Sequence, residues 1–371
     1  MNKLMKICFI LMACGAVFVS VGVLMGGKLV FSYSFGGKVQ TEPAEECKML
    51  TEETKPFTNI ELEVEDFSIE VAAGDGYAVT YPEGDADMDT DASVQGETLK
   101  LTQKYKKQFH FFHFDTLGIG RIGFLASNKE NAAEKQKIIV TVPEGTALGK
   151  IQVKQNMGLL TLKDLQAEDI ELDMDYGSLT IQDVKAGSFA LKNDYGDVVA
   201  NNVAFEKTEL ALSYGDADIR DGSLGEAVCS LACGDMSLHD VNGTSAQIKM
   251  DYGSFAVYTV QFESLRAVLS AGNMELKQYT GEQVELEMNY GSLKAEEVDV
   301  SVFTAALNDG NADLVFAGEL DAYAMDLSCD DGKILVDGQK QGSEYHCKGN
   351  GSGKTVSVDA DYGNISVDFA R

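Results

Sequence analysis

The fold is decided by a stretch that returns every 19 residues, as in Asp175-Tyr176-Gly177, Asp194-Tyr195-Gly196 and Ser213-Tyr214-Gly215. The glycines that share this spacing are Gly158, Gly177, Gly196, Gly215, Gly234, Gly253, Gly272, Gly291 and Gly310. A fixed short period of this kind predicts a repeat architecture, in which each unit stacks only on its neighbours.

Each unit alternates apolar and polar residues on both sides of its glycine. Leu179 and Ile181 follow Gly177 by two and four residues, and the segment 170–174 alternates in the same way before it. Alternation with period two predicts strands with one buried face. Glycine suits a corner between two strands because it accepts positive φ without a Cβ penalty. An apolar residue seven positions after the glycine, such as Val184, is expected to mark the far corner.

The predicted fold class is therefore all-β, a parallel β-solenoid of 19-residue coils with a non-repeating β cap and one N-terminal transmembrane helix. The predicted domains are a membrane anchor at 1–30, a linker at 31–55, a β cap region at 56–150 and solenoid repeats at 151–371, with irregular last coils. A cap is expected because an open end of the stack would expose unpaired backbone. At roughly 4.8 Å per coil, the regular part would extend about 50 Å.

The first 30 residues predict a membrane anchor. Ile7 to Met25 carries no charge, and a helix of that length spans about 28 Å, close to the thickness of the hydrocarbon core. Lys3 and Lys6 precede it, which places the bulk of the chain outside the cytoplasm. Two alternatives are a cleaved signal peptide and a lipoprotein signal, the latter suggested by the segment 11–14, which ends in Cys14.

Composition narrows the classes of function. The 371 residues include 59 acidic and 30 basic side chains, a net charge of −29, which argues against nucleic acid as a partner. The seven cysteines form no recognisable disulfide framework. The sequence holds no Ser-His-Asp, metal-ligand or phosphate-loop pattern, so we expect no enzyme activity and no cofactor.

The segment 138–146, which runs on through 151–153 and 158–160, resembles the bacterial putative-adhesin family, otherwise known as a domain of unknown function. The segment 57–62 and the tyrosine-glycine units are similar to that family as well. The resemblance covers residues 56 to 371. It implies a membrane-associated surface protein built from β-solenoid repeats, and it carries over no catalytic residues.

Acidic residues at the glycine corners are the candidate metal ligands. Those two positions before the glycine are Asp175, Asp194 and Asp251, and those one position after it are Asp197, Asp216 and Asp235. Stacked coils would bring such carboxylates to about 5 Å from one another, which favours Ca²⁺. We expect instead no metal here and turn residues whose side chains bond to nearby backbone, because serine and alanine interrupt both rows. The calcium site is the alternative.

Aromatic residues form the other candidate surfaces. The tyrosines that directly precede a repeat glycine are Tyr176, Tyr195, Tyr214, Tyr252, Tyr290 and Tyr362. We expect them to stack on one another along the corner, and the alternative is a platform on which sugars stack. The stretch Phe109 to Phe114 is expected either to be buried in the cap or to contact a membrane or a partner.

The sequence thus predicts a membrane-anchored, non-enzymatic surface protein whose partners are the membrane, through the N-terminal helix, and an unknown surface glycan or protein. One alternative is a cell-envelope sensing or regulatory module that acts through a membrane protein partner. Another is a polysaccharide-active enzyme, whose work would be done by clustered carboxylates.

Overall fold

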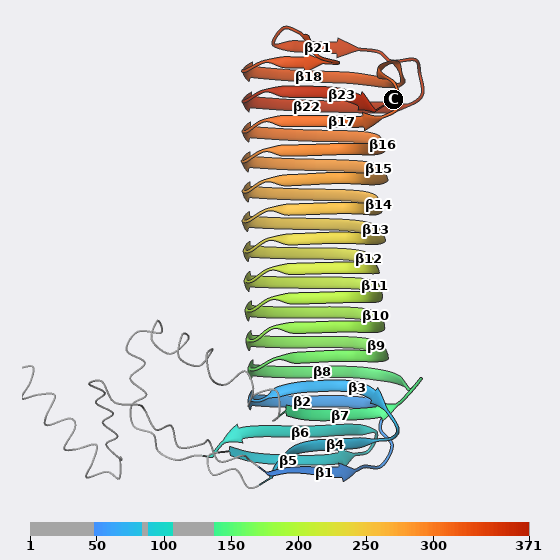
Figure 1. Cartoon of the computed structure of the whole chain (residues 1–371), viewed down its shortest axis with the longest axis vertical. Coiled ribbons are helices and arrows are strands. Elements are labelled where there is room, and N and C mark those ends of the chain that lie inside the picture. The colour runs from blue at the N-terminus through green and yellow to red at the C-terminus, as the bar shows by residue number, and fades with distance from the viewer. Residues whose placement is uncertain (1–47, 84–87, 107–136, 371) are drawn as a thin grey trace, which may run out of the picture.

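The chain forms a tall stack of β coils, shown by a computed structural model that describes residues 48–83, 88–106 and 137–370 (Figure 1). The described residues are all-β apart from one 3-10 turn, η1 (Leu320–Ala322). The regular coils are the strands β9 (Leu160–Tyr176), β10 (Leu179–Tyr195), β11 (Val198–Tyr214), β12 (Ala217–Cys233), β13 (Met236–Tyr252), β14 (Phe255–Ala271), β15 (Met274–Tyr290) and β16 (Leu293–Asp309).

Neighbouring coils pair in parallel and in register with the sequence period. Leu179 of β10 lies between Leu160 of β9 and Val198 of β11, each 19 residues away. One repeat is therefore one coil, and the solenoid predicted from the spacing of the glycines is confirmed. Successive strands lie about 4.8 Å apart, so each coil adds that height to the stack.

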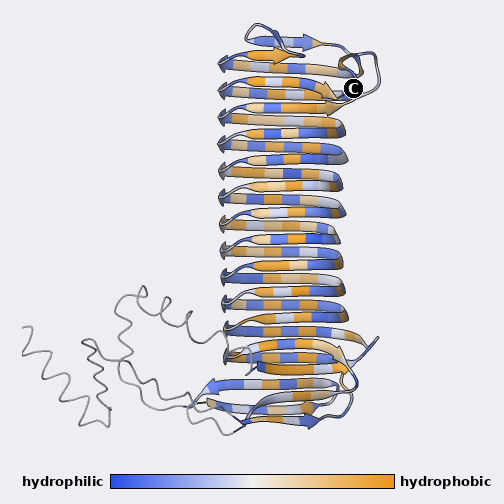
Figure 2. Cartoon of the chain, in the orientation of Figure 1, coloured by the Kyte–Doolittle hydropathy of each residue, from blue (hydrophilic) through white to orange (hydrophobic). Residues whose placement is uncertain are grey.

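The core runs through the centre of the stack, between the two sides of each coil. Figure 2 shows apolar and polar residues intermixed along the strands of the regular coils. In β10 the inward residues Leu179, Ile181, Val184 and Leu191 are all buried. Each coil thus covers the apolar faces of its neighbours, and no coil forms a core alone.

The far corner is made by a residue that the sequence analysis did not single out. The turn lies one position before the buried apolar residue, where the backbone takes positive φ of 52° to 57°. The residues there are Asp164, Asp183, Asn202, Asp221, Asp240, Thr259, Gln278 and Glu297. Aspartate and asparagine tolerate this left-handed conformation better than most residues, because their short polar side chains bond to local backbone.

At the N-terminal end, parallel stacking continues into the region predicted as a cap. The strands there are β1 (Lys48–Glu53), β2 (Asn59–Asp66), β3 (Ser68–Gly74), β4 (Ala78–Glu83), β5 (Met88–Gln95), β6 (Thr98–Tyr105), β7 (Lys137–Pro143) and β8 (Ala147–Met157). β2 and β3 form a coil between β8 and β9 on one side and β6 and β7 on the other. The antiparallel strands β1, β4 and β5 complete this base.

At the C-terminal end, the last strands of the chain are inserted into the stack below earlier ones. The strands there are β17 (Ala312–Ala317), β18 (Tyr323–Asp331), β19 (Ile334–Val336), β20 (Gln339–Lys340), β21 (Glu344–Cys347), β22 (Lys354–Tyr362) and β23 (Ile365–Ala370). β22 pairs with both β16 and β18, and β23 pairs with both β17 and β19. The final coil in sequence is therefore the penultimate coil in space, as the order of labels in Figure 1 shows.

Two predictions concern segments outside the described residues. The predicted anchor at 7–25 and the aromatic stretch at 109–114 both lie there. Within the described ranges, no helix has the length and apolar character needed to cross a bilayer.

Candidate functional site: the tyrosine corner

The glycine corner brings the backbones of successive coils into close contact. A Cβ added at Gly234, whose φ is +145°, would lie closer than 3.0 Å to the carbonyl oxygen of Gly215 on the coil before it. The amide of Gly234 donates a hydrogen bond to the carbonyl of Tyr252 on the next coil at 3.0 Å. Only a residue without a side chain fits here, and the residue directly before each glycine is left at the outer edge of the corner.

These outer residues form one continuous line along the stack, which we call the corner row. From base to tip it comprises Met157, Tyr176, Tyr195, Tyr214, Cys233, Tyr252, Ala271, Tyr290, Asp309, Tyr362 and Asp331. Its tyrosines are between 44% and 65% exposed. The row therefore presents large, partly apolar rings to solvent over most of the length of the solenoid.

The lower tyrosines of the row stack on one another. The ring centroids of Tyr176 and Tyr195 lie 4.9 Å apart with an interplanar angle of 4°, and those of Tyr195 and Tyr214 lie 4.9 Å apart at 6°. The predicted aromatic ladder is thus confirmed for these three. Above Tyr214 the pattern changes, because tyrosine then alternates with the smaller residues Cys233, Ala271 and Asp309.

The aspartates that follow the glycines bond to the next coil. Oδ1 of Asp197 accepts a hydrogen bond from the amide of Asp216 at 3.0 Å, and Oδ1 of Asp216 accepts one from the amide of Asp235 at 2.8 Å. Oδ1 of Asp235 accepts one from the amide of Ser254 at 2.7 Å. Each carboxylate therefore satisfies a corner amide that has no place in the strand ladder, which is the role of a turn residue.

The aspartates that precede the glycines are less engaged. Oδ1 of Asp194 accepts a hydrogen bond from the hydroxyl of Ser213 at 3.3 Å, while Asp175 and Asp251 occupy the same column on other coils. Among residues 48–83, 88–106 and 137–370, no group of three or more His, Cys, Asp or Glu side chains could hold a metal ion. The hydrogen bonds of Asp197, Asp216 and Asp235 agree with the expected role as turn residues, and the calcium site is the alternative that stays untested.

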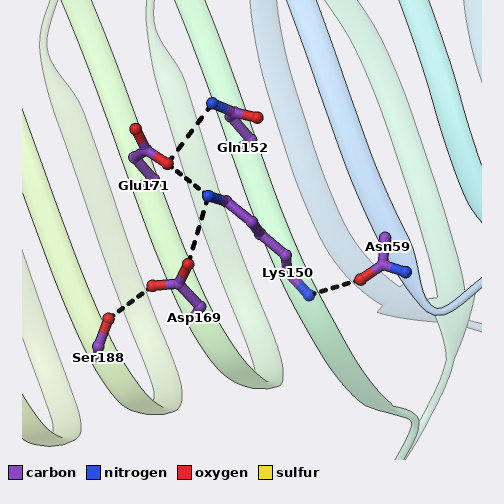
Figure 3. Close-up of polar contacts among 6 residues, drawn as sticks. All are labelled: Asn59, Lys150, Gln152, Asp169, Glu171 and Ser188. Carbon is purple, nitrogen blue, oxygen red and sulfur yellow. Dashed lines mark hydrogen bonds and ion pairs between the residues drawn. The ribbon is translucent and has the colours of Figure 1, made fainter.

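Polar side chains on the flat sides of the stack also contact neighbouring coils. Near the base, the amine of Lys150 contacts Glu171 at 2.5 Å and Asp169 at 3.4 Å (Figure 3). Ser188 on the following coil donates a hydrogen bond to Asp169 at 2.5 Å. These exposed contacts stabilise the stack by only about 0–1 kcal/mol each, and they occupy carboxylates that a ligand would otherwise reach.

Higher in the stack, beside the corner row, one flat side is hollowed. The hollow has a volume of about 300 Å³ and lies between Lys192 and Lys249. These lysines share a column with Ala211 and Ser230, which separate them on the two intervening coils. Because the short side chains of Ala211 and Ser230 lie between the two long lysine side chains, the surface is lower between the lysines. The hollow was not predicted from the sequence, although Lys192, Ala211, Ser230 and Lys249 follow one another at intervals of 19 residues.

The corner side of the hollow is lined by polar and small residues. Ser213 and Asp251 contribute a hydroxyl and a carboxylate, and Ala232 lies between them. These three directly precede Tyr214, Tyr252 and Cys233 of the corner row. The hollow is therefore lined by the immediate sequence neighbours of three corner-row residues, although it is not lined by the row itself.

The buried cysteine of this region is chemically inert. Burial raises the pKa of the Cys229 thiol to about 12, so it stays protonated in the folded protein at neutral pH. Cys233 is a free thiol at the corner and is partly exposed. Burial also raises the pKa of Tyr279, whose hydroxyl donates a hydrogen bond to the carbonyl of Phe262 at 3.0 Å.

Comparison with known proteins gives one family. Residues 57–228 and 223–368 each match the Toastrack DUF4097 family, which confirms the resemblance inferred from the sequence. No curated protein matches the chain.

Two solved structures show some likeness to this chain. One is described as a putative adhesin from Bacteroides fragilis, with 12% identity over 88% of this chain and 98% of that chain and a TM-score of 0.30. The other is described as a putative cell adhesion protein from Clostridium sporogenes, with 8% identity over 87% of this chain and 100% of that chain and a TM-score of 0.19.

Proposed function

We propose a function for this chain, which belongs to the Toastrack DUF4097 family: it is a membrane-anchored, non-enzymatic scaffold that binds partners at the cell surface through the corner row. The observation that carries the proposal is the line of exposed tyrosines. Soluble proteins rarely gather exposed apolar surface along one edge, and tyrosine is enriched where proteins bind partners.

The rigidity of the stack supports a binding role. Every regular coil is held by parallel ladders to both neighbours, so the corner row keeps a fixed spacing without any ligand. A preformed surface loses little entropy when it binds. The acidic exterior and the carboxylates used in turns and ion pairs add solubility and order rather than reaction chemistry.

The topology supports display away from a membrane. β1 is the first described strand and lies at the base of the stack, at the end opposite the C-terminus (Figure 1). An anchor at 7–25 would therefore hold the base near the bilayer and project the corner row outward. The alternative of a sensing module gains no support from the described contacts.

The test is binding of the purified full chain to isolated bacterial cell envelopes, measured by co-sedimentation. Replacing Tyr290 and Tyr362 together by serine is expected to weaken binding at least tenfold. The matched control replaces Val228 and Val302, exposed apolar residues off the corner row, by serine and is expected to bind as the parent chain does. Equal binding by both variants would refute the corner row as the binding surface. Loss of the chain from alkali-washed membranes on deletion of residues 1–30 tests the anchor.

A further inference from the structure

We infer that the corner row and the hollow together form a saccharide site, in which one pyranose ring lies over Cys233 between Tyr214 and Tyr252 and the adjoining sugar lies in the hollow. This inference deepens the proposed function and rests on it, because it names the ligand class and the place.

The gap over Cys233 has the height of one ring. Tyr214, Cys233 and Tyr252 are paired in register on three successive coils. The rings of Tyr195 and Tyr214 repeat at 4.9 Å, so two coils separate the Tyr214 and Tyr252 positions by roughly 10 Å. In the lower row a ring occupies each coil, whereas here a short thiol side chain stands between two tyrosines. We call this space the slot.

The rings that border the slot are open to solvent. Tyr214 is 50% exposed and Tyr252 is 65% exposed, the largest value among the corner tyrosines. Tyr252 has Cys233 and Ala271 as its neighbours in the row, so neither adjacent coil covers it with a ring. A flat ligand with apolar faces can therefore contact tyrosine on both sides, as the middle ring does between Tyr176 and Tyr214.

The hollow supplies the polar half of the site. Its volume of about 300 Å³ lies at the lower end of the range for small-molecule sites. Ser213 and Ser230 offer hydroxyl groups, Asp251 offers a carboxylate, and Lys192 and Lys249 offer amines at the two ends. The amine of Lys192 lies 3.8 Å from Asp173, whereas Lys249 has no ion-pair partner among the described residues.

A saccharide fits this combination better than an aromatic side chain does. A pyranose has apolar C–H faces that stack on tyrosine and a rim of hydroxyl groups that need both donors and acceptors. The hollow provides donors and acceptors in a small area, and a purely apolar ring would leave these groups without partners. The residues that line the corner side of the hollow, Ser213, Ala232 and Asp251, directly precede the three residues of the slot. We therefore place two linked sugars across the two neighbouring spaces.

The test measures binding of chitotetraose and cellotetraose to the full chain by isothermal titration calorimetry and tyrosine fluorescence. The chain has no tryptophan, so its emission comes from its 14 tyrosines, two of which border the slot, and a change in that emission is expected on binding. The full chain is kept in a polyoxyethylene ether detergent, because a detergent with a sugar headgroup would compete with the tetrasaccharides. One ring between two tyrosines with a few hydrogen bonds supports a Kd of about 1 mM for at least one probe.

Two variants close the two halves of the site separately. Cys233→Tyr fills the slot with a ring, and Ser230→Lys fills the hollow with a long side chain. Each is expected to weaken binding at least tenfold. Both should fold, because tyrosine and lysine already occupy the same columns on adjacent coils, at Tyr214 and Lys249. Circular dichroism and thermal melts check this. The matched control, Ala271→Tyr, fills a gap that does not adjoin the hollow and is expected to bind within twofold of the parent chain.

Several results would overturn the inference. One is that neither tetrasaccharide binds at a concentration on the order of ten times the expected Kd. Another is that the parent chain, Cys233→Tyr and Ser230→Lys bind equally well. Binding of a tryptophan-containing peptide, lost in Cys233→Tyr while neither sugar binds, would replace the saccharide by a protein side chain. The envelope assay of the proposed function varies Tyr290 and Tyr362, which lie outside this site, so either proposal can fail without the other.

Discussion

Replacement of Gly234 by alanine tests how closely the coils approach at the corner. The added Cβ meets the carbonyl oxygen of Gly215 closer than 3.0 Å, and φ at Gly234 is +145°. A non-glycine residue in such a conformation costs about 1–3 kcal/mol. The clash with backbone costs a further 1–3 kcal/mol or so, because the strands must separate. The two contributions add, so we expect the free energy of unfolding to fall by about 2–6 kcal/mol, and few single substitutions reach the upper half of that range.

Two further glycines separate the two contributions. A Cβ at Gly338 meets no atom within 4 Å, but φ there is +71°, so alanine should cost about 1 kcal/mol through the backbone alone. A Cβ at Gly76 also meets nothing within 4 Å and its φ lies outside the left-handed region, so alanine should change stability by less than about 0.5 kcal/mol.

The assay is urea unfolding of the full chain followed by far-UV circular dichroism. The expected order of cost is Gly234→Ala, then Gly338→Ala, then Gly76→Ala. If Gly234→Ala costs no more than Gly338→Ala, the corner glycines are needed only for their dihedral angles. The explanation from close approach of successive coils would then be wrong.

Three other changes have expected outcomes that follow from the structure. Deleting 354–370 removes the inserted coil with its four buried valine and isoleucine side chains, about 10 kcal/mol of burial. Limited proteolysis should then cut 318–353 while β9 to β16 resist, and protection of 318–353 would contradict the insertion. Asp216→Ala should cost about 0.5–1.5 kcal/mol by removing the exposed hydrogen bond to the amide of Asp235, whereas Asp216→Asn should cost under about 0.5 kcal/mol with or without Ca²⁺. A loss in Asp216→Asn seen only with Ca²⁺ would favour the metal. Burial raises the pKa of Cys229 in the folded protein to about 12 from 9.0. The contribution of this thiol to folding stability is therefore fully present below pH 9 and is lost as the pH rises toward 12, by up to about 1.4 kcal/mol per pH unit. The chain with Cys229→Ala should lose stability less steeply over this range, and equal slopes for the two chains would contradict the burial.

The sequence predicted the regular coils because their determinants are local and periodic. The glycine fixes the corner, and alternation such as that of Leu179 and Ile181 fixes which face is buried. We predicted the far corner one residue too late, at Val184, because we identified it by the apolar residue that is buried there and not by the residue that takes positive φ. Asp183 can take a positive φ because its short polar side chain bonds to local backbone. The recurrence of aspartate and asparagine at this position of the repeat was the signal that could have placed the far corner correctly.

The two ends of the stack could not be predicted from spacing. β2 and β3 stack on β8 and β9 from 91 residues away, and β22 and β23 return to lie between strands that precede them. Such pairings depend on which exposed edge is free after the regular coils have formed, and no local period records that. The hollow could not be predicted for a related reason. It depends on the relative lengths of side chains at the same position of four successive coils, and a pattern read within one coil does not record this.

The most direct test of the corner row as a binding surface is tyrosine nitration of the full chain with and without cell envelopes, read by mass spectrometry. We predict that envelopes protect Tyr252, Tyr290 and Tyr362 from nitration, because all three project from the corner. Tyr258, which stacks on His239 on a flat side of the stack, should react equally in both samples. Equal nitration of the three corner tyrosines with and without envelopes, or protection of Tyr258 in their place, would contradict the proposed function.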